Sequence, residues 1–306
     1  MMNRKIFSLT VIFCLLATAG FAQANLLNAK TTEEIGKRTA AQDSLDNDKP
    51  LPYGYVGDRD ILFGKKIWEV IDLNQRINFP LYYPVEKNLG NDRKPLYDVL
   101  ITAVRDGRIA QVFSDEYFNT KQTVKDIESR LVRVDTSDAG IEEMNSNLKA
   151  YRSGKMKINP EFITRTEIEA DAVSAYKVLG LWYFDKRQGE LKYRMLAICP
   201  LVPDVTTLGS GDKNEPPIEL FWVYFPAARD ILHRSKAFND KNSAIPIDFD
   251  HLLNARRFSA VVIKEENVYA DRAINDYLKD NSQMQLLESE RVRDKIRNFE
   301  QDMWNY

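Results

Sequence analysis

The sequence predicts a mixed α/β fold of the α+β kind, in which helices flank one mixed, largely antiparallel sheet. Two long strand-like runs, Tyr176–Phe184 and Leu191–Val202, are joined by a short polar loop and indicate an antiparallel hairpin. Helical patterns stand on both sides of this hairpin in the chain, as expected where helices pack on a sheet. We expect a leader over 1–22, a disordered arm over 23–57 and a globular domain over 58–306.

The first residues are typical of a signal peptide. A short positive segment, Asn3-Arg4-Lys5, precedes an apolar run from Ile6 to Ala19. As a helix this run would span about 21 Å, too little for a hydrocarbon core of roughly 30 Å, so the membrane-anchor interpretation is disfavoured. Small residues favour cleavage before Gln23, and Ala22-Gln23-Ala24 offers a second site.

The arm over 23–57 is polar and poor in large apolar groups. A weak helix over Thr32–Gln42 is the regular element we expect in it, and it ends in Lys49-Pro50-Leu51-Pro52. Such a composition buries too little apolar surface to offset the entropy of ordering. Two interpretations stay open: a disordered linker, or a segment that orders on a partner.

The composition argues against a nucleic-acid-binding protein and against a disulfide-bonded one. Loss of Arg4 and Lys5 with the leader takes the formal charge from −2 to about −4, whereas a nucleic-acid-binding protein favours a basic stripe. One of the two cysteines, Cys199, stays in the mature chain, so no intramolecular disulfide is possible. Its apolar surroundings favour a small buried side chain over the alternative, a reactive thiol.

The globular part begins with an amphipathic pattern. Apolar residues recur at helical spacing around Ile67 and predict a helix over Ile61–Ile77. Pro80 and Pro84 prevent its continuation, and the pair between them, Tyr82-Tyr83, must pack on something. The elements expected next are a helix at Pro95–Val104, a strand at Ile109–Phe113, a helix at Thr120–Ser129, a strand at Arg130–Val134, a loop or frayed helix at Ser137–Asn159 and a weak helix at Glu161–Ala175.

The chain after the hairpin alternates loops, strands and helices. Val205–Pro217 is rich in Gly, Thr, Asp and Pro and is predicted to be a loop. Asp248 is a good N-cap for a short helix that carries Phe249 and Leu252. The other expected elements are a strand at Glu219–Phe225, a helix from Pro226 to His233, a strand at Phe258–Lys264 and helices at Asp271–Leu278 and Met284–Met303.

Two stretches share a layout. Trp68 precedes Tyr97-Asp98-Val99-Leu100 by 29 residues, and Trp222 precedes Phe249-Asp250-His251-Leu252 by 27. Basic residues and then a strand follow each stretch. A divergent internal duplication around one sheet accounts for this similarity, and so does chance.

The last predicted helix has a narrow apolar stripe with spacings of 4, 3 and 4 residues. A stripe left open on a monomer would be an unusual surface patch, so it covers either a partner or the protein's own sheet. Trp304, at the end of the helix, is the tryptophan expected to face a partner. The residues with a predicted partner-binding role are Val292, Ile296, Phe299, Met303, Trp304, Trp68, Tyr82 and Tyr83.

The sequence holds no recognisable catalytic, cofactor or metal motif. His233 and His251 are 18 residues apart and lack Cys or carboxylate neighbours at zinc spacing. Gly-x-Ser-x-Gly, Gly-x-Gly-x-x-Gly and Walker patterns are absent. Asp58-Arg59-Asp60 and Asp98 offer carboxylates for an acid–base pair, but a solvated loop and a helix start explain them equally. We therefore expect no catalytic residue, no cofactor and no metal.

The tryptophans offer a further alternative. Trp68, Trp182, Trp222 and Trp304 suit a carbohydrate-binding groove, although such residues more often lie in a core. A periplasmic hydrolase or carbohydrate-binding protein is therefore the second class of function. A deep cleft with paired carboxylates or a strained nucleophile would favour that class.

Several blocks in order along the chain share one resemblance. They are Ile67–Leu73 with Arg76-Ile77-Asn78 and Pro80–Pro84, then Trp182–Lys186, Leu220–Pro226, Arg256–Ser259, Lys264–Tyr269, Leu287–Arg291 and Met303–Tyr306. Together they run from about Asp58 to the C-terminus. In these blocks the chain resembles the gliding-motility protein N family, GldN or PorN, which belongs to the type IX protein secretion system of Bacteroidetes.

This resemblance implies a non-enzymatic structural component of the periplasm. It implies an outer-membrane lipoprotein partner, GldK or PorK, and a ring-like complex that contains several copies of the chain. It also implies contact with the periplasmic domains of the GldL–GldM motor, and a role in cargo secretion and, where present, gliding motility. The lipoprotein would hold the protein at the outer membrane without direct membrane insertion. As the charge already indicates, we expect no nucleic-acid partner.

The mature protein is expected to begin at Gln23, because the small residues before it match a signal-peptidase site. N-terminal sequencing of native material measures this directly. Material that retains Ile6–Ala19, or that carries lipid on Cys14, would contradict the prediction.

Overall fold

The computed structural model describes residues 49–86, 94–146, Leu148, 159–206, 216–238, 247–279 and 281–304. The predicted signal peptide, the expected helix at Thr32–Gln42 and most of the predicted loop Val205–Pro217 lie outside these residues. Within the described chain, no helix combines the length and apolarity that crossing a membrane requires.

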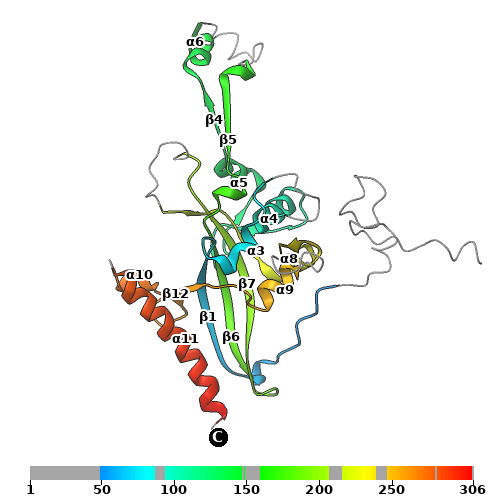
Figure 1. The fold of residues 1–306 in the computed structure, drawn as a ribbon, viewed down its shortest axis with the longest axis vertical. Helices are drawn as coiled ribbons and strands as arrows, with labels where there is room; N and C mark the ends of the chain where they lie inside the picture. Colours follow the sequence, from blue (N-terminus) through cyan, green and yellow to red (C-terminus); the bar gives the residue numbers. More distant parts are fainter. Residues whose placement is uncertain are drawn as a thin grey trace, which may run out of the picture. The chain divides into compact units, whose positions relative to one another are not determined.

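The main element is an eight-stranded sheet in the order β12-β1-β6-β7-β9-β2-β3, with β8 paired to β7. Figure 1 labels β12, β1, β6 and β7 of this sheet. All of its described pairings are antiparallel, which confirms the predicted α+β class and its largely antiparallel sheet. Its strands are β1 (Ile61–Asp72), β2 (Val112–Phe113), β3 (Lys121–Gln122), β6 (Ala175–Asp185), β7 (Glu190–Val202), β8 (Ile218–Glu219), β9 (Trp222–Tyr224) and β12 (Val261–Glu265).

The amphipathic helix predicted over Ile61–Ile77 is wrong, because this segment is the long strand β1. It pairs with β6 from Ile61 to Asp72, and its neighbours Ile67 and Trp68 are both almost fully buried although they point to opposite faces. A strand covered on both faces has consecutive apolar residues, and these satisfy a helical spacing by coincidence.

The predicted hairpin is confirmed as β6 and β7, which pair from Ala175 to Asp185. Gly189 has a φ of +66° in the connecting loop, a conformation that favours glycine. A bulge follows Leu179 in the register. At the next position, a Cβ on Gly180 would lie 2.1 Å from the Tyr193 ring, so this part of the hairpin requires a glycine.

Most of the predicted helices are present with small changes of boundary, including those expected from Pro95, Pro226, Asp248 and Met284. The Asp248 carboxylate accepts a hydrogen bond from the amide of His251, as expected of an N-cap. The helices are α3 (Phe79–Tyr82), α4 (Leu96–Arg105), α5 (Val124–Leu131), α6 (Asp138–Ser146), α8 (Phe225–Arg234), α9 (Phe249–Asn254), α10 (Ile274–Tyr277) and α11 (Ser282–Trp304). Short 3₁₀ turns are η1 (Asp58–Asp60), η2 (Arg76–Asn78), η3 (Pro160–Phe162) and η4 (Ala170–Ala172).

The weak helix predicted at Glu161–Ala175 is wrong. Its centre is the strand β5 (Ile163–Glu167), which pairs with β4 (Val132–Thr136) in a ribbon of two strands. Neither strand contains a buried residue, so local apolar pattern could not reveal it. A second small ribbon joins β10 (Lys236–Ala237) to β11 (Ile247–Asp248).

The core has two layers, because successive residues of a strand point to opposite faces of the sheet. Val178 of β6 belongs to the main cluster, which α4, α8 and α9 complete. Its neighbour Leu179 belongs to a smaller cluster with Trp68, Trp222 and Cys199 on the other face. Cys199 is fully buried, and burial raises the pKa of its thiol well above the ordinary value, which supports the interpretation as a small core residue.

A buried ion pair joins β1 to the segment before β12. Glu69, which is 1 % exposed, accepts hydrogen bonds of 2.7 and 2.8 Å from both terminal nitrogens of Arg256. The Arg256 guanidinium lies 4.2 Å from the centre of the Tyr193 ring. Burial would lower the pKa of Arg256, but the hydrogen bond and charge of Glu69 together with the contact to Tyr193 outweigh burial and raise it, so the guanidinium stays charged.

One feature of the sheet agrees with the suggested duplication, namely the way in which strands of the two proposed units pair. β1, which carries Trp68, pairs with β12, and β9, which carries Trp222, pairs with β2. In each case the first strand of one proposed unit pairs with the last strand of the other. The duplication itself stays a prediction.

Helix α11 covers the protein's own sheet. Val292 and Ile296 form a buried cluster with Ile67 of β1 and Val262 of β12. Further along, the Phe299 ring stacks on Phe63 with centroids 4.5 Å apart. Of the two alternatives for the apolar stripe, the structure therefore shows the intramolecular one for its first three positions.

Phe299→Ala should lower the free energy of unfolding by roughly 1–3 kcal/mol, because a half-buried ring is lost from the contact with β1. Trp304→Ala is the matched control, because its side chain is 69 % exposed and should change stability by less than about 0.5 kcal/mol. Urea denaturation measures both. Equal losses in the two variants would contradict this assignment of the stripe.

Candidate partner-binding surface

The predicted partner-binding residues divide into buried and exposed groups. Trp68, Val292 and Ile296 are 0 %, 2 % and 3 % exposed and belong to the core. Their role as partner contacts is therefore corrected, since no partner reaches them while the domain stays folded. Trp222 is also fully buried, so neither it nor Trp68 lines a carbohydrate groove.

Tyr82 and Tyr83 pack against each other and against neighbouring residues of the chain. Tyr82 donates a hydrogen bond of 3.0 Å to the carbonyl oxygen of Asp171. Its ring meets the Tyr83 ring edge-on at 4.8 Å, and Tyr83 also packs against Phe79 at 5.3 Å. Tyr83 keeps an exposed edge, so it is available to a partner but needs none to be packed.

The last turn of α11 remains accessible. Met303 is half-buried, and Trp304 is largely exposed. Among the predicted contact residues on this helix, Trp304 is therefore the one whose side chain lies mainly in solvent.

The described chain has an apolar groove of about 510 Å³ beside β12. Its lining residues come from β12, from α10 with the residue before it, from the first turns of α11 and, through Lys177, from β6. No carboxylate is among its lining residues, which are Lys177, Val261, Val262, Ile263, Lys264, Ala273, Ile274, Asn275, Ser282, Gln285 and Leu286. This lining does not match the cleft that a hydrolase would need.

Exposed apolar side chains lie in the loop between β12 and α10 and in the second turn of α11, next in the chain to segments that line this groove. Val268 and Tyr269, in the loop after β12, are 91 % and 77 % exposed. Leu286 and Leu287, in the second turn of α11, are 51 % and 63 % exposed. We call these four residues and the groove the β12 surface. Concentrated apolar exposure of this kind is typical of an interaction site.

Two lysines that line the groove, Lys177 and Lys264, are held by a charged network. Lys177 bonds Glu219 at 2.8 Å and Glu116 at 3.0 Å, and Lys264 also pairs with Glu116. Burial would lower the pKa of Lys177, but its bonds to Glu219 and Glu116 outweigh burial and raise it. Both lysines therefore stay protonated and unsuited to act as nucleophiles, which need a lowered pKa.

The free edge of β12 is closed within the chain. The amide of Val262 donates a hydrogen bond of 2.9 Å to the hydroxyl of Ser289 on α11. Lys264 forms a single antiparallel bridge with Ala273. Because these contacts occupy the outer edge, the β12 surface offers side chains rather than an open strand to a partner.

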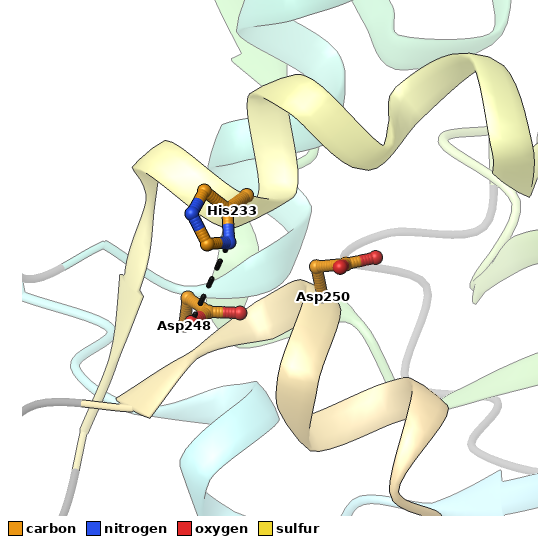
Figure 2. A group of neighbouring side chains, drawn as sticks. All are labelled: His233, Asp248 and Asp250. Atoms are coloured by element: carbon orange, nitrogen blue, oxygen red, sulfur yellow. Dashed lines mark ion pairs between the residues drawn. The ribbon is translucent and has the colours of Figure 1, made fainter. Parts of the chain in front are cut away.

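A second cluster brings together one imidazole and two carboxylates (Figure 2). His233 comes from the end of α8, Asp248 from the junction of β11 with α9, and Asp250 from the first turn of α9. One ligand atom from each lies within 4.8 Å of the others. The sequence spacing does not predict this cluster, because its residues come from elements that meet only in the tertiary structure.

The carboxylates of this cluster already have hydrogen-bond donors. The Asp248 carboxylate accepts a hydrogen bond of 2.6 Å from the His251 amide and lies 3.7 Å from Nδ1 of His233. The Asp250 carboxylate accepts hydrogen bonds of 2.8 and 3.0 Å from two nitrogens of Arg229. A metal would have to compete with the buried Arg229 charge, so the cluster serves to cap α9 and to hold it against α8.

Sequence reasoning missed most of the β12 surface. The helical stripe through Val292 and Ile296 defines the buried face of α11, and Leu286-Leu287 lies off that stripe. Two sequence features could have indicated this surface: an apolar pair that does not fit the helical stripe, and the apolar pair Val268-Tyr269 within a polar stretch.

Comparison with families of known proteins gives one finding. The model of a family described as gliding motility associated protein GldN matches residues 56–305. No curated protein matches the chain significantly.

We expect a chelator to leave the thermal unfolding midpoint unchanged, because Arg229 and the α9 amide already occupy the carboxylates of the His233 cluster. Metal analysis of native protein, with His233→Ala and the exposed-residue control His251→Ala, provides the measurement. Stoichiometric zinc that His233→Ala alone removes would contradict this expectation.

Proposed function

The chain belongs to the GldN family of gliding motility associated proteins, components of gliding and type IX secretion, and from this we propose that it is a non-enzymatic structural subunit of the periplasmic secretion apparatus. In this proposal it binds an outer-membrane lipoprotein of the GldK/PorK kind and assembles with it into a ring. It also contacts the periplasmic domains of the GldL–GldM motor. Its work is to support cargo secretion and, where present, gliding.

The observation that carries this proposal is the β12 surface. Val268, Tyr269 and Leu287 are mostly exposed, and in the chain they adjoin β12 and the turn of α11 that supply lining residues of the groove. Burial of such area contributes roughly 25 cal/mol per Å², which makes a cluster of this kind a strong anchor for a protein partner. We assign the lipoprotein to this surface.

The rigidity of the surface supports the same assignment. Ser289 is fully buried and ties α11 to β12, and ion pairs hold the lining side chain of Lys177. A surface built on fixed elements loses little conformational entropy on binding. The lining residues of the groove include neither a carboxylate nor a histidine, and the proposed role is assembly.

The test replaces Val268 and Leu287 by Glu in the full chain. Because both side chains are mostly exposed, the unfolding midpoint should stay near that of the wild type, while co-purification of the lipoprotein from native envelope is lost. The matched control is Ile77→Glu, a similarly exposed residue at 57 % in η2.

Retention of the full amount of lipoprotein by a stable Val268→Glu/Leu287→Glu variant would sink the assignment of this surface. Loss of the lipoprotein in the Ile77→Glu control would instead show that any added charge disturbs the complex.

A further inference from the structure

The chain holds its own residues 50–57 in a clamp of arginines. Three guanidinium groups reach three backbone carbonyls of this segment: Arg229 donates to Leu51 at 2.7 Å, Arg194 to Gly54 at 3.1 Å and Arg187 to Tyr55 at 2.7 Å. We call residues 50–57 the strap and these three arginines, with Asn254, the clamp.

The clamp also recognises a side chain. The Tyr53 ring has the Arg229 guanidinium at 4.1 Å and the Arg194 guanidinium at 4.5 Å. Its hydroxyl donates a hydrogen bond of 2.9 Å to Oδ1 of Asn254. Cation–π contacts and a satisfied hydroxyl together specify tyrosine at this position.

The clamp is built into the domain. Arg229 is 8 % exposed and Asp250, which receives two of its nitrogens, is 4 % exposed. Asn254 donates a further hydrogen bond of 2.7 Å to Asp250. A buried carboxylate thus orients Arg229 and Asn254, two of the three groups that contact Tyr53, so this part of the site keeps its shape whichever chain supplies the strap.

The strap itself is weakly integrated. None of residues 50–57 is buried, and the described backbone hydrogen bonds include none that joins residues 50–56 to a strand. Leu51 and Tyr55 are 82 % and 85 % exposed on either side of the clamped Tyr53. Two large apolar groups are therefore held in solvent by a segment that contributes little to the core.

One glycine stands where the strap would turn. Gly57 lies between the clamped residues and the short turn η1 that leads into β1, whereas Gly54 is inside the clamped segment. Glycine permits a wide range of backbone angles, so rotation at Gly57 can redirect the strap ahead of β1. Exchange of an identical segment between copies is a low-cost route to assembly, because each contact is preserved.

We propose that the clamp is an assembly site, in which the strap of one copy of this chain, anchored by Tyr53, occupies the clamp of a second copy. This inference rests on the proposed function, since it supplies the contact between copies in the ring. Packing of the two copies then covers Leu51 and Tyr55. The clamp and the β12 surface have no residue in common, so the two contacts can be tested apart.

The test mixes two full-length variants. Tyr53→Ala has an intact clamp and a defective strap, whereas Arg187→Ala/Arg194→Ala has an intact strap and a defective clamp. Arg229 is left in place, because its loss would leave the Asp250 carboxylate buried without its cation. Native mass spectrometry should show a heterodimer in the mixture at least about tenfold above the homodimers of either variant alone.

The control uses Tyr53→Phe in place of Tyr53→Ala. Its strap keeps the stacked ring and loses only the hydrogen bond to Asn254, so it competes for its own clamp and the heterodimer should fall. Absence of the heterodimer in the first mixture would overturn the proposal and leave the strap as an intramolecular contact. In that case lipoprotein binding through the β12 surface would be unaffected, so failure of exchange is distinguishable from failure of the proposed function.

Discussion

The pairing of β6 with β1 on one side and β7 on the other is the constraint on which the rest of the structure depends. These three strands run together over most of their lengths and are apolar on both faces where the core clusters meet. Both faces therefore need a cover. Helices α4, α8 and α9 complete one cluster, α11 covers the cluster around Ile67, and the Trp68–Trp222 cluster fills the opposite face.

The buried pair of Glu69 and Arg256 shows how specific this arrangement is. A carboxylate at the centre of β1 is tolerable only if a cation reaches it, and Arg256 does so from a residue with a φ of +51°. Stacking on Tyr193, whose ring lies over Gly180, connects the pair to the bulge of the hairpin. Removal of one partner from such a pair costs about 3–5 kcal/mol, so the pair selects one placement of the segment that leads into β12.

The surfaces assigned to assembly lie at the margins of this core. The β12 surface combines residues of α11, α10 and the edge strand, and the clamp combines residues of α8 and α9 with residues of the β6–β7 loop and the first half of β7. Both rest on buried polar contacts, Ser289 with Val262 in one case and Asp250 with Arg229 in the other. Each proposed contact is therefore built on side chains that the folded domain already holds in place.

The sequence by itself determined the fold class, the β6–β7 hairpin, the helices α4, α8 and α11, and the N-cap at Asp248, because each follows from signals within a few residues of the chain. It could not determine that Ile61–Asp72 is a strand, since an apolar run covered on both faces fits a helix equally well. The tertiary structure alone decided that Val292 and Ile296 are core while Leu287 is surface, and that Arg187, Arg194 and Arg229 converge on Tyr53. Those outcomes depend on which distant segments meet, and no local spacing encodes the convergence of residues from the hairpin and α8 on a segment before β1.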